Sequence, residues 1–432
     1  MSPVSRNTLR HRAHQLLRST LRLAPPPLRF AAMRQMVDLP SRPDPRLSFK
    51  IAETEDELEA CFGILHDAYV SEGFMTPHPS GLRVTPYHAL PTTTTLCALF
   101  DGQVVGTVSI VREGVFGFPM QKIFDISHVR AQGGNIAEVS ALAIHPDFRR
   151  SGGRILFPLM KFVHQYCTEQ FDTRHVLIAV NPARIDLYEA LLMFRRLRAA
   201  PVERYDFVNG APAVGASLDF AHFDSNLARV YGRRAPQRDL HRLFFRTRLP
   251  NLQLPDRRYY TTNHAVLTPA LMDHFFNQRT QVFDQLDQRQ RCLLRSIYDL
   301  EAYAPVLPAV DPAAAARIEL RRHPRHSVCC PAQLQLDSGQ RLPPVALNIL
   351  HLGEGRFEAE SAEPLPQNQA AQITVQLGAT VRAVITARVS NAVRSAQQPR
   401  YAFDVQQADG AWSQCVSALQ RSQTHRELAL AA

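Results

Sequence analysis

The sequence predicts an α/β (α+β) protein in which a mixed region of strands and helices is followed by a helical segment and a small β-barrel. Three observations support this fold class. The chain has 432 residues, about three times an ordinary domain of ~150 residues. Residues 47–219 alternate between strand patterns and helical patterns. Residues 317–410 contain short alternating runs separated by Gly, Pro and Asn, which is typical of a small barrel.

Local signals define the elements of the mixed region. A capping box, Thr54-Glu-Asp-Glu57, starts a helix that reaches about Tyr69. Asp101–Gly102 forms a two-residue hairpin turn. Further helices are expected from Gly152 to about Phe171 and from Pro182, a first-turn proline, to about Phe194. The expected strands are Leu47–Ala52, Thr94–Phe100, Gln103–Val111, Ala137–Ile144, His175–Val180, Glu203–Val208 and Val214–Phe220.

Five segments are expected along the chain. Thr268–Pro269 is an N-cap and first-turn pair in a mostly helical stretch, and Pro308, Pro312 and four consecutive alanines favour a linker. A terminal helix is expected over Trp412–Glu427. The segments are a basic mobile arm (1–46), the mixed α/β domain (47–220), a helical extension (221–304), a linker (305–316) and the barrel with its C-terminal helix (317–432).

The positive charge is concentrated in the N-terminal arm. The chain has a formal charge of +10, and residues 1–46 contain nine Arg against two Asp. Residues 47–215 are acidic, with 15 basic against 18 acidic side chains. This distribution excludes a wholly basic nucleic-acid binder, so neither DNA nor RNA is expected as a partner. The arm is either a solvated tail or a docking element for an acidic carrier protein or for anionic lipid.

Cysteine usage and hydropathy predict an intracellular protein. The seven Cys include no C-x-x-C spacing, so neither a disulfide framework nor a metal site is expected. No apolar run approaches the ~20 residues that span a bilayer. The N-terminus also lacks the apolar core of a signal peptide. We therefore expect a cytoplasmic location, with peripheral contact at the inner membrane through the arm as the alternative.

One predicted strand and the loop after it have the features of a ligand site. A period of two along this strand places Glu138, Ser140 and Leu142 on one face. A carboxylate on a buried strand needs either a partner, such as a structural ion pair, or a chemical role. In the following loop, Gly152 and Gly153 allow close backbone approach at a helix N-terminus, and Arg149 adds positive charge. The alternative for this loop is an ordinary basic turn.

These elements resemble the acyl-coenzyme A N-acyltransferase (GNAT) fold. In that fold an R-x-x-G-x-G/A loop cradles the pantetheine diphosphate. Arg149 and Gly152 occupy its first two positions, and Arg154 replaces the small third residue. The segment Asn181-Pro-Ala-Arg-Ile-Asp-Leu-Tyr188 resembles the N-x-x-A-x-x-L-Y segment of the same fold. The resemblance implies that Tyr188 protonates the leaving thiolate, whereas a tyrosine in a helix is otherwise most often a core aromatic.

A more specific resemblance, over roughly residues 48–300, is to the bacterial long-chain N-acyl amino acid synthases, relatives of the acyl-homoserine lactone synthases. It rests on Pro79–Pro91, Glu138-Val-Ser140, Asn181–Pro182 with Tyr188, and Val208–Val214. It implies an acyl carrier protein thioester as donor, an amino acid as acceptor, an amide product and no tightly bound cofactor. Glu138 is the expected general base. The residues expected to bind the donor are Ser140, Arg149, Gly152, Gly153 and Asn181.

The C-terminal region resembles the PilZ domain, a small β-barrel that binds cyclic di-GMP. Its pattern is R-x-x-x-R followed by D/N-x-S-x-x-G, and guanidinium groups can grip phosphates and guanine edges. Leu350 replaces the serine of the second motif. The residues expected to bind the nucleotide are Arg321, Arg322, Arg325, Asn348 and Gly353. The alternative is a degenerate barrel that contacts protein.

Three functional hypotheses remain at this point. The leading one is an N-acyltransferase that moves a long acyl chain from acyl carrier protein to an amino acid and is regulated by cyclic di-GMP. The second is a GNAT enzyme that uses acetyl- or acyl-coenzyme A as donor. The third is a cyclic di-GMP receptor whose acyltransferase domain has decayed. Donor preference distinguishes the first two hypotheses.

Overall fold

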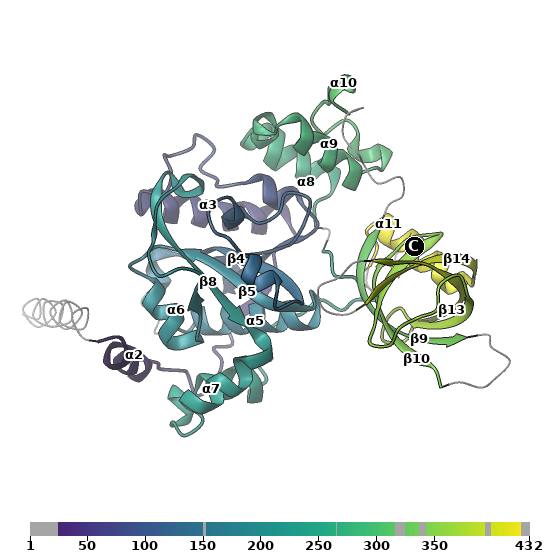
Figure 1. Ribbon diagram of the computed structural model, residues 1–432. Helices are drawn as coiled ribbons and strands as arrows, with labels where there is room; N and C mark the ends of the chain where they lie inside the picture. Colours follow the sequence, from purple (N-terminus) through teal and green to yellow (C-terminus); the bar gives the residue numbers. More distant parts are fainter. Residues whose placement is uncertain are drawn as a thin grey trace, which may run out of the picture.

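The computed structural model describes residues 25–149, 153–264, 266–315, 325–336, 343–393 and 399–424. The described chain contains a mixed sheet surrounded by helices and a separate closed barrel (Figure 1). The sheet has the strand order β1-β2-β3-β4-β5-β8-β6, and β7 pairs with β8. The predicted fold class is therefore confirmed.

The sheet is antiparallel except for its β4–β5 pair. Each predicted strand is present within a few residues of its expected bounds, and β6 is an additional short strand. The strands are β1 Leu47–Ile51, β2 Thr93–Phe100, β3 Gln103–Arg112, β4 Asn135–Ile144, β5 Thr173–Val180, β6 Arg195–Arg196, β7 Val202–Tyr205 and β8 Ala211–Asp219.

Helices cover both faces of this sheet. Helix α3 (Glu55–Ser71) has the predicted capping box, in which the Thr54 side chain accepts from the Glu57 N–H. Helix α3 packs in one apolar cluster. Helix α5 (Leu156–Glu169) packs with β1, β2 and β5 in a second cluster, which we call the α5 cluster. Helix α6 (Ile185–Leu192) also joins the α5 cluster, and α4 (Ser127–Arg130) is a single short turn. Helix α5 begins four residues later than expected from Gly152.

The predicted alternation along β4 is interrupted at Ala141, which has φ +56°. Ala141 and Leu142 together lie opposite the single residue Val108, because the β3–β4 register shifts there. Such a bulge reverses the faces that follow it. Leu142 consequently packs with Ala137 and Val139 against the α5 cluster. The expectation that Leu142 shares a face with Glu138 was wrong.

The part of the N-terminal arm that the structure describes is packed rather than mobile. Helix α2 (Pro26–Gln35) lies beside α6, and the Arg29 Nε is 2.9 Å from Asp186 Oδ2. Arg34 Nε donates to the carbonyl of Ala190 at 2.7 Å. These contacts fix residues 26–35 against helix α6. The predicted helical segment before residue 25 lies outside the described residues.

The expected helical extension consists of two groups on different sides of the sheet (Figure 1). Helix α7 (Phe223–Tyr231) and the π-helical turn Arg242–Arg246 join the α5 cluster. Helices α8 (Pro269–Asp273) and α9 (Gln288–Ile297) pack near α3, where Arg279 Nη1 lies 2.6 Å from Glu59 Oε1. The first part of the expected linker packs on α9, and α10 spans Pro312–Ala315.

The predicted barrel is confirmed as a closed antiparallel barrel of order β10-β11-β14-β13-β12-β9. Trp412, in the predicted C-terminal helix, packs edge-on against Phe357 of the barrel. The elements are β9 His326–Leu336, β10 Val345–Leu352, β11 Arg356–Ser361, β12 Ala370–Gln376, β13 Arg382–Val393, β14 Arg400–Ala408 and α11 Gly410–Gln420.

An extended segment near residue 260 joins the barrel to the α/β domain. The N–H of Thr262 donates to the carbonyl of Ser327 at 3.0 Å, and Cys329 donates to Tyr260 at 2.9 Å. Gly378 lies so close to this segment that an added Cβ would be 1.9 Å from the carbonyl oxygen of Arg258. Direct backbone contact therefore fixes the barrel against this segment.

Candidate active site

The central feature of the α/β domain is a cavity between β4 and β5. These parallel strands pair from Asn135 with Thr173 as far as Glu138 with Leu177. Beyond that pair the strands diverge, and a cavity of about 370 Å³ is lined by residues 139–144 of β4, residues 178–180 of β5 and Asn181 directly after β5. The bulge at Ala141 lies within this divergence. The strands themselves therefore form the two walls of the site.

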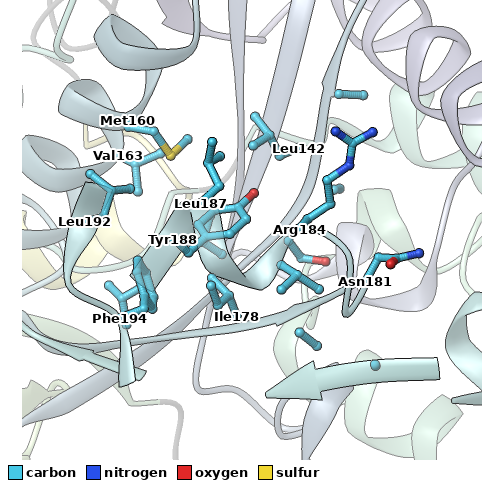
Figure 2. A pocket seen from close by; sticks show the side chains of 18 of the residues that line it. Leu142, Met160, Val163, Ile178, Asn181, Arg184, Leu187, Tyr188, Leu192 and Phe194 are labelled. Atoms are coloured by element: carbon cyan, nitrogen blue, oxygen red, sulfur yellow. The ribbon is translucent and has the colours of Figure 1, made fainter. Parts of the chain in front are cut away.

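The cavity is polar at one side and apolar at the other. Figure 2 shows Arg184 and Asn181 on one side, with Met160, Val163 and Leu192 on the opposite side. Glu72 of α3 pairs with Arg184 at 3.5 Å across the polar side. The apolar side continues toward aromatic residues of the α5 cluster, Phe220, Phe223 and Phe244. This shape suits a molecule with a polar head and an apolar chain.

Tyr188 of α6 lines the middle of this cavity. Its ring packs edge-on against Phe194 with centroids 5.9 Å apart, and its hydroxyl points away from Phe194 toward the side where Leu142 and Arg184 lie (Figure 2). Burial raises the pKa of Tyr188 to about 12. The hydroxyl is therefore protonated at neutral pH and can donate a proton.

Glu138 is buried at the last paired position of β4, with 2% of its surface exposed. Its Oε2 accepts a hydrogen bond from the N–H of Met120 at 3.0 Å. Burial raises the pKa of Glu138 to about 8, although the Met120 hydrogen bond opposes this shift. No salt bridge to Glu138 occurs among the described residues. The carboxyl does not line the large cavity directly.

The predicted donor loop is described in part. Arg149 is exposed at the cavity edge, and its Nε donates to the carbonyl of Ile144 at 2.9 Å. Gly153 has φ +88°, and an added Cβ would lie 2.4 Å from the Phe157 ring. The loop geometry at this position therefore requires glycine. Gly152 lies outside the described residues.

Ser140 and Asn181 both line the cavity, from β4 and from the end of β5. Asn181 Oδ1 accepts from the N–H of Ala183 at 2.8 Å and so shapes the turn into α6. Ser140 also lines a second, smaller recess that contains Arg83 and Tyr87. The structure thus brings Ser140, Arg149, Asn181 and Tyr188 to one cavity and places Glu138 behind its wall.

The sequence analysis did not identify Tyr205 and Arg83 as site residues. Tyr205 lines the large cavity, and its hydroxyl is buried without a hydrogen-bond partner among the described residues. Burial raises its pKa, and the Glu138 charge raises it further. Arg83 belongs to the Pro79–Pro91 motif, which was the available signal for it. Tyr205 had no such signal.

The described barrel residues predicted to bind a nucleotide lie on β10 (Asn348), in the turn after β10 (Gly353) and in the entry segment before β9 (Arg325). Arg325 pairs with Glu358, and His351 lies 3.4 Å from the same carboxylate. Hydrogen bonding from His351 and the charge of Arg325 lower the pKa of Glu358 to about 2. Asn348 Oδ1 contacts the Cys329 Sγ at 3.6 Å, and Gly353 donates to the Arg356 carbonyl at 2.9 Å. Arg321 and Arg322 lie outside the described residues.

No cluster of His, Cys, Asp or Glu with metal-binding geometry occurs within the described ranges. All seven cysteines are described, and each is a free thiol. Among the described helices, none combines the length and the apolar character that crossing a membrane requires.

The α/β domain is similar to a known family of acyltransferases. Residues 60–219 match the family model of the N-acyl amino acid synthase FeeM. No curated protein matches the chain. Over residues 60–219 the chain is therefore similar to the N-acyl amino acid synthases, and this match supports an acyltransferase enzyme.

Several solved structures are similar to this chain. FeeM, an N-acyl amino acid synthase from uncultured soil microbes, is 24% identical and covers 42% of this chain and 95% of its own, with a TM-score of 0.37. BjaI, a CoA-dependent acyl-homoserine lactone synthase, is 21% identical to this chain. The match covers 46% of this chain and 99% of BjaI, with a TM-score of 0.32. The ribosomal-protein-S5-alanine acetyltransferase of Vibrio fischeri is 10% identical to this chain. The match covers 42% of this chain and 96% of the acetyltransferase, with a TM-score of 0.30.

Proposed function

We propose that this enzyme transfers a long acyl chain from an acyl carrier protein thioester to the amine of an amino acid. The observation that carries the proposal is the cavity of about 370 Å³ that leads from a polar side at Arg184 to an apolar side at Val163. An acetyl group would leave most of the apolar side empty. A long acyl chain would fill it and bury apolar surface.

The donor enters from the polar side of the cavity. Arg149 and Arg184 are exposed there and supply positive charge for the phosphate of a phosphopantetheine arm. The backbone conformation at Gly153 lets the loop approach that phosphate closely. The thioester then lies where β4 and β5 diverge, with the acyl chain between α5 and β5. Because the β4–β5 ladder ends at Glu138, main-chain N–H groups along β4 are available to stabilise the oxyanion.

Glu138 acts as the general base. The ammonium group of the acceptor must lose a proton before its nitrogen can attack the thioester carbon. A base whose pKa lies near 8 is matched to this task close to neutral pH. Because Glu138 lies behind the cavity wall, the proton reaches it through a water molecule or through a hydroxyl, for which Tyr205, whose hydroxyl is buried without a partner among the described residues, is the candidate.

Tyr188 acts as the general acid. Attack by the amine nitrogen forms the C–N bond, and collapse of the tetrahedral intermediate breaks the C–S bond. The departing thiolate takes the proton of the Tyr188 hydroxyl, which is protonated because its pKa is about 12. The second proton that the nitrogen loses on becoming an amide returns to the Tyr188 oxygen, and Glu138 releases the first proton to solvent. The products are an N-acyl amino acid and the free thiol of the carrier. No covalent acyl-enzyme is formed.

The experiment that tests this function compares donors directly. Purified enzyme is incubated with a mixture of the standard amino acids and either long-chain acyl carrier protein thioesters or acetyl-coenzyme A, and products are identified by mass spectrometry. An N-acyl amino acid from the carrier thioester, absent with Glu138→Ala, supports the proposal. Transfer from acetyl-coenzyme A alone would establish the second hypothesis instead.

We further propose that the barrel binds cyclic di-GMP and regulates this reaction. Arg325 directly precedes β9, and β9 pairs with β10, which holds Asn348; this proximity supports a common binding surface. Arg325 is held by Glu358, so a nucleotide must compete with this ion pair for the guanidinium. Calorimetric titration with cyclic di-GMP tests the binding. We expect binding heat with the wild type and none with Asn348→Ala. If the wild type gives no heat at high micromolar ligand, the barrel contacts only protein.

A further inference from the structure

A small recess adjoins the large cavity on the other side of β4. Tyr69, Ser140 and Ala141 line both spaces. The recess has a volume of about 10 Å³, which is enough for one oxygen atom of a carboxylate whose remaining atoms stay in the large cavity. It opens at the bulge of β4, beside the point where the proposed thioester carbon lies. A substrate group placed in this recess would therefore be within a few bonds of the reacting atoms.

Arg83 is the cation of this recess. Its guanidinium stacks 3.9 Å above the Tyr69 ring and lies 5.1 Å from the Phe207 ring. Its Nη2 donates to the carbonyl of Phe207 at 2.9 Å. Burial lowers the pKa of Arg83, yet a guanidinium stays charged at neutral pH. The recess therefore holds a partly desolvated positive charge.

This charge has no carboxylate partner in the part of the chain that the structure describes. Some other partly buried arginines have a carboxylate partner, as Arg29 has in Asp186 and Arg279 in Glu59. Arg257 lacks one but donates to the Tyr166 hydroxyl and the Thr261 carbonyl. A buried cation without a counter-ion is costly. An anionic group supplied by a ligand would remove that cost.

The rest of the recess supplies hydrogen-bond donors and no competing anion. No Asp or Glu is among its lining residues. Burial and the nearby Arg83 lower the pKa of His88 to about 3, so the imidazole is neutral. Its Nδ1 accepts from the N–H of Thr85 at 3.1 Å, which leaves the proton on Nε2. The hydroxyls of Thr85, Tyr87, Ser109 and Ser140 also line the recess.

Tyr205 connects this recess to the proposed base. Its hydroxyl is buried without a hydrogen-bond partner among the described residues and interacts electrostatically with both Glu138 and Arg83. The α-carboxylate and the amine of an amino acid are separated by a single carbon. A carboxylate held by Arg83 would thus place the amine near the Tyr205 hydroxyl and β4, on the path to Glu138.

We propose that Arg83 binds the α-carboxylate of the acceptor, so that the enzyme selects amino acids over simple amines. This inference rests on the proposed function, because it assumes that the acceptor amine attacks at the β4–β5 divergence. Arg83 positions the substrate and takes no part in proton transfer. The chemical class of the acceptor is therefore an α-amino acid with a free carboxylate.

The test compares each amino acid with the amine that lacks its carboxylate, such as tyrosine with tyramine and leucine with isopentylamine. Dodecanoyl-acyl carrier protein is the donor. Wild-type enzyme is expected to prefer the amino acids, and Arg83→Gln is expected to lower their kcat/KM ~10- to 100-fold while leaving the amines unaffected. Arg204→Gln is the matched control, since the Arg204 side chain is 81% exposed.

The outcomes separate the inference from the proposed function. Equal loss with amino acids and amines in Arg83→Gln, or no preference in the wild type, overturns the carboxylate role. Absence of transfer to either class by the wild type overturns the proposed function itself. If Arg83→Gln does not fold, wild-type binding of N-dodecanoyl tyrosine and N-dodecanoyl tyramine is compared by calorimetry. Equal affinities would refute the inference.

Discussion

The N–H of Met120 donates to Oε2 of Glu138 at 3.0 Å, and this is the one hydrogen bond that the described chain gives to a nearly fully buried carboxyl. A carboxylate with several donors would be strongly acidic, whereas a single donor cannot offset the loss of water. The pKa of Glu138 therefore rises to about 8. The same contact fixes the direction of the carboxyl at the last paired position of β4.

The first prediction concerns the activity of Glu138→Gln. If Glu138 is the base, kcat falls by ~10²–10⁴ because the amide cannot accept the proton. In the wild type, kcat/KM rises with pH toward a plateau above about 8, since the carboxyl must be ionised to act. Glu113→Gln, on the exposed surface, is the control. Unchanged turnover in Glu138→Gln would remove the residue from the mechanism.

The second prediction concerns the pH dependence of stability. The pKa of Glu138 is about 8 in the folded protein against an ordinary value of 4.5, so between these values the folded state binds more protons than the unfolded state. The free energy of unfolding therefore decreases as pH rises through this window, by up to about 1.4 kcal/mol per pH unit. The Glu138→Gln variant has no titrating group at this position, so its free energy of unfolding does not decrease in this way.

Urea unfolding of both proteins at several pH values measures this effect. The stability of Glu138→Gln relative to the wild type is expected to increase from pH ~4.5 to pH ~8 and to be constant below that range. A difference that does not depend on pH would mean that the carboxyl titrates normally in the fold.

The third prediction concerns Tyr188→Phe. Loss of the hydroxyl removes the proton for the departing thiolate, so kcat with the carrier thioester falls by ~10²-fold or more. An aryl thioester, whose thiolate leaves without protonation, is expected to restore most of the rate. Tyr260→Phe is the control, because Tyr260 is 36% exposed and lies on the segment that contacts the barrel. An equal rate deficit with both donors would argue against the acid role.

Much of the fold could be predicted because its signals are local. The capping box at Thr54 and the alternating runs of the sheet and barrel are determined by neighbouring residues, and the structure contains them. The bulge at Ala141 could not be predicted, because alanine has no intrinsic preference for φ +56° and the surrounding sheet imposes it. This one residue changed the face on which Leu142 lies.

The site was predictable only where a motif marked it. Tyr188, Asn181 and Arg149 were predicted through the resemblance of their motifs to a known family, and they meet at one cavity. The recess depends on contacts across long sequence distances, such as that of Arg83 with Phe207, 124 positions apart. No local pattern encodes such a contact. The packing of α2 against α6 is likewise a tertiary effect that the charge of the arm did not indicate.

The fourth prediction concerns acyl-chain length. Val163 of α5 lines the apolar side of the cavity, so Val163→Phe fills space that the end of a long chain would occupy. The preferred chain is expected to become shorter, with little change for short donors, as measured by mass spectrometry with a mixture of carrier thioesters. Val115→Phe, at an exposed position, is the control. An unchanged chain-length profile would place the acyl group elsewhere.

The last prediction concerns the loop at the cavity edge. Gly153 has φ +88°, a conformation that costs a residue with a Cβ about 1–2 kcal/mol, and the Phe157 ring must also move. Gly153→Ala is expected to lower the free energy of unfolding by about this amount and to raise the KM for the thioester donor, because the strained loop can no longer approach the phosphate. Gly355→Ala is the matched control, since its Cβ would meet open space. Equal stability of the two variants would show that the loop relaxes freely, and an unchanged KM would show that it does not bind the donor.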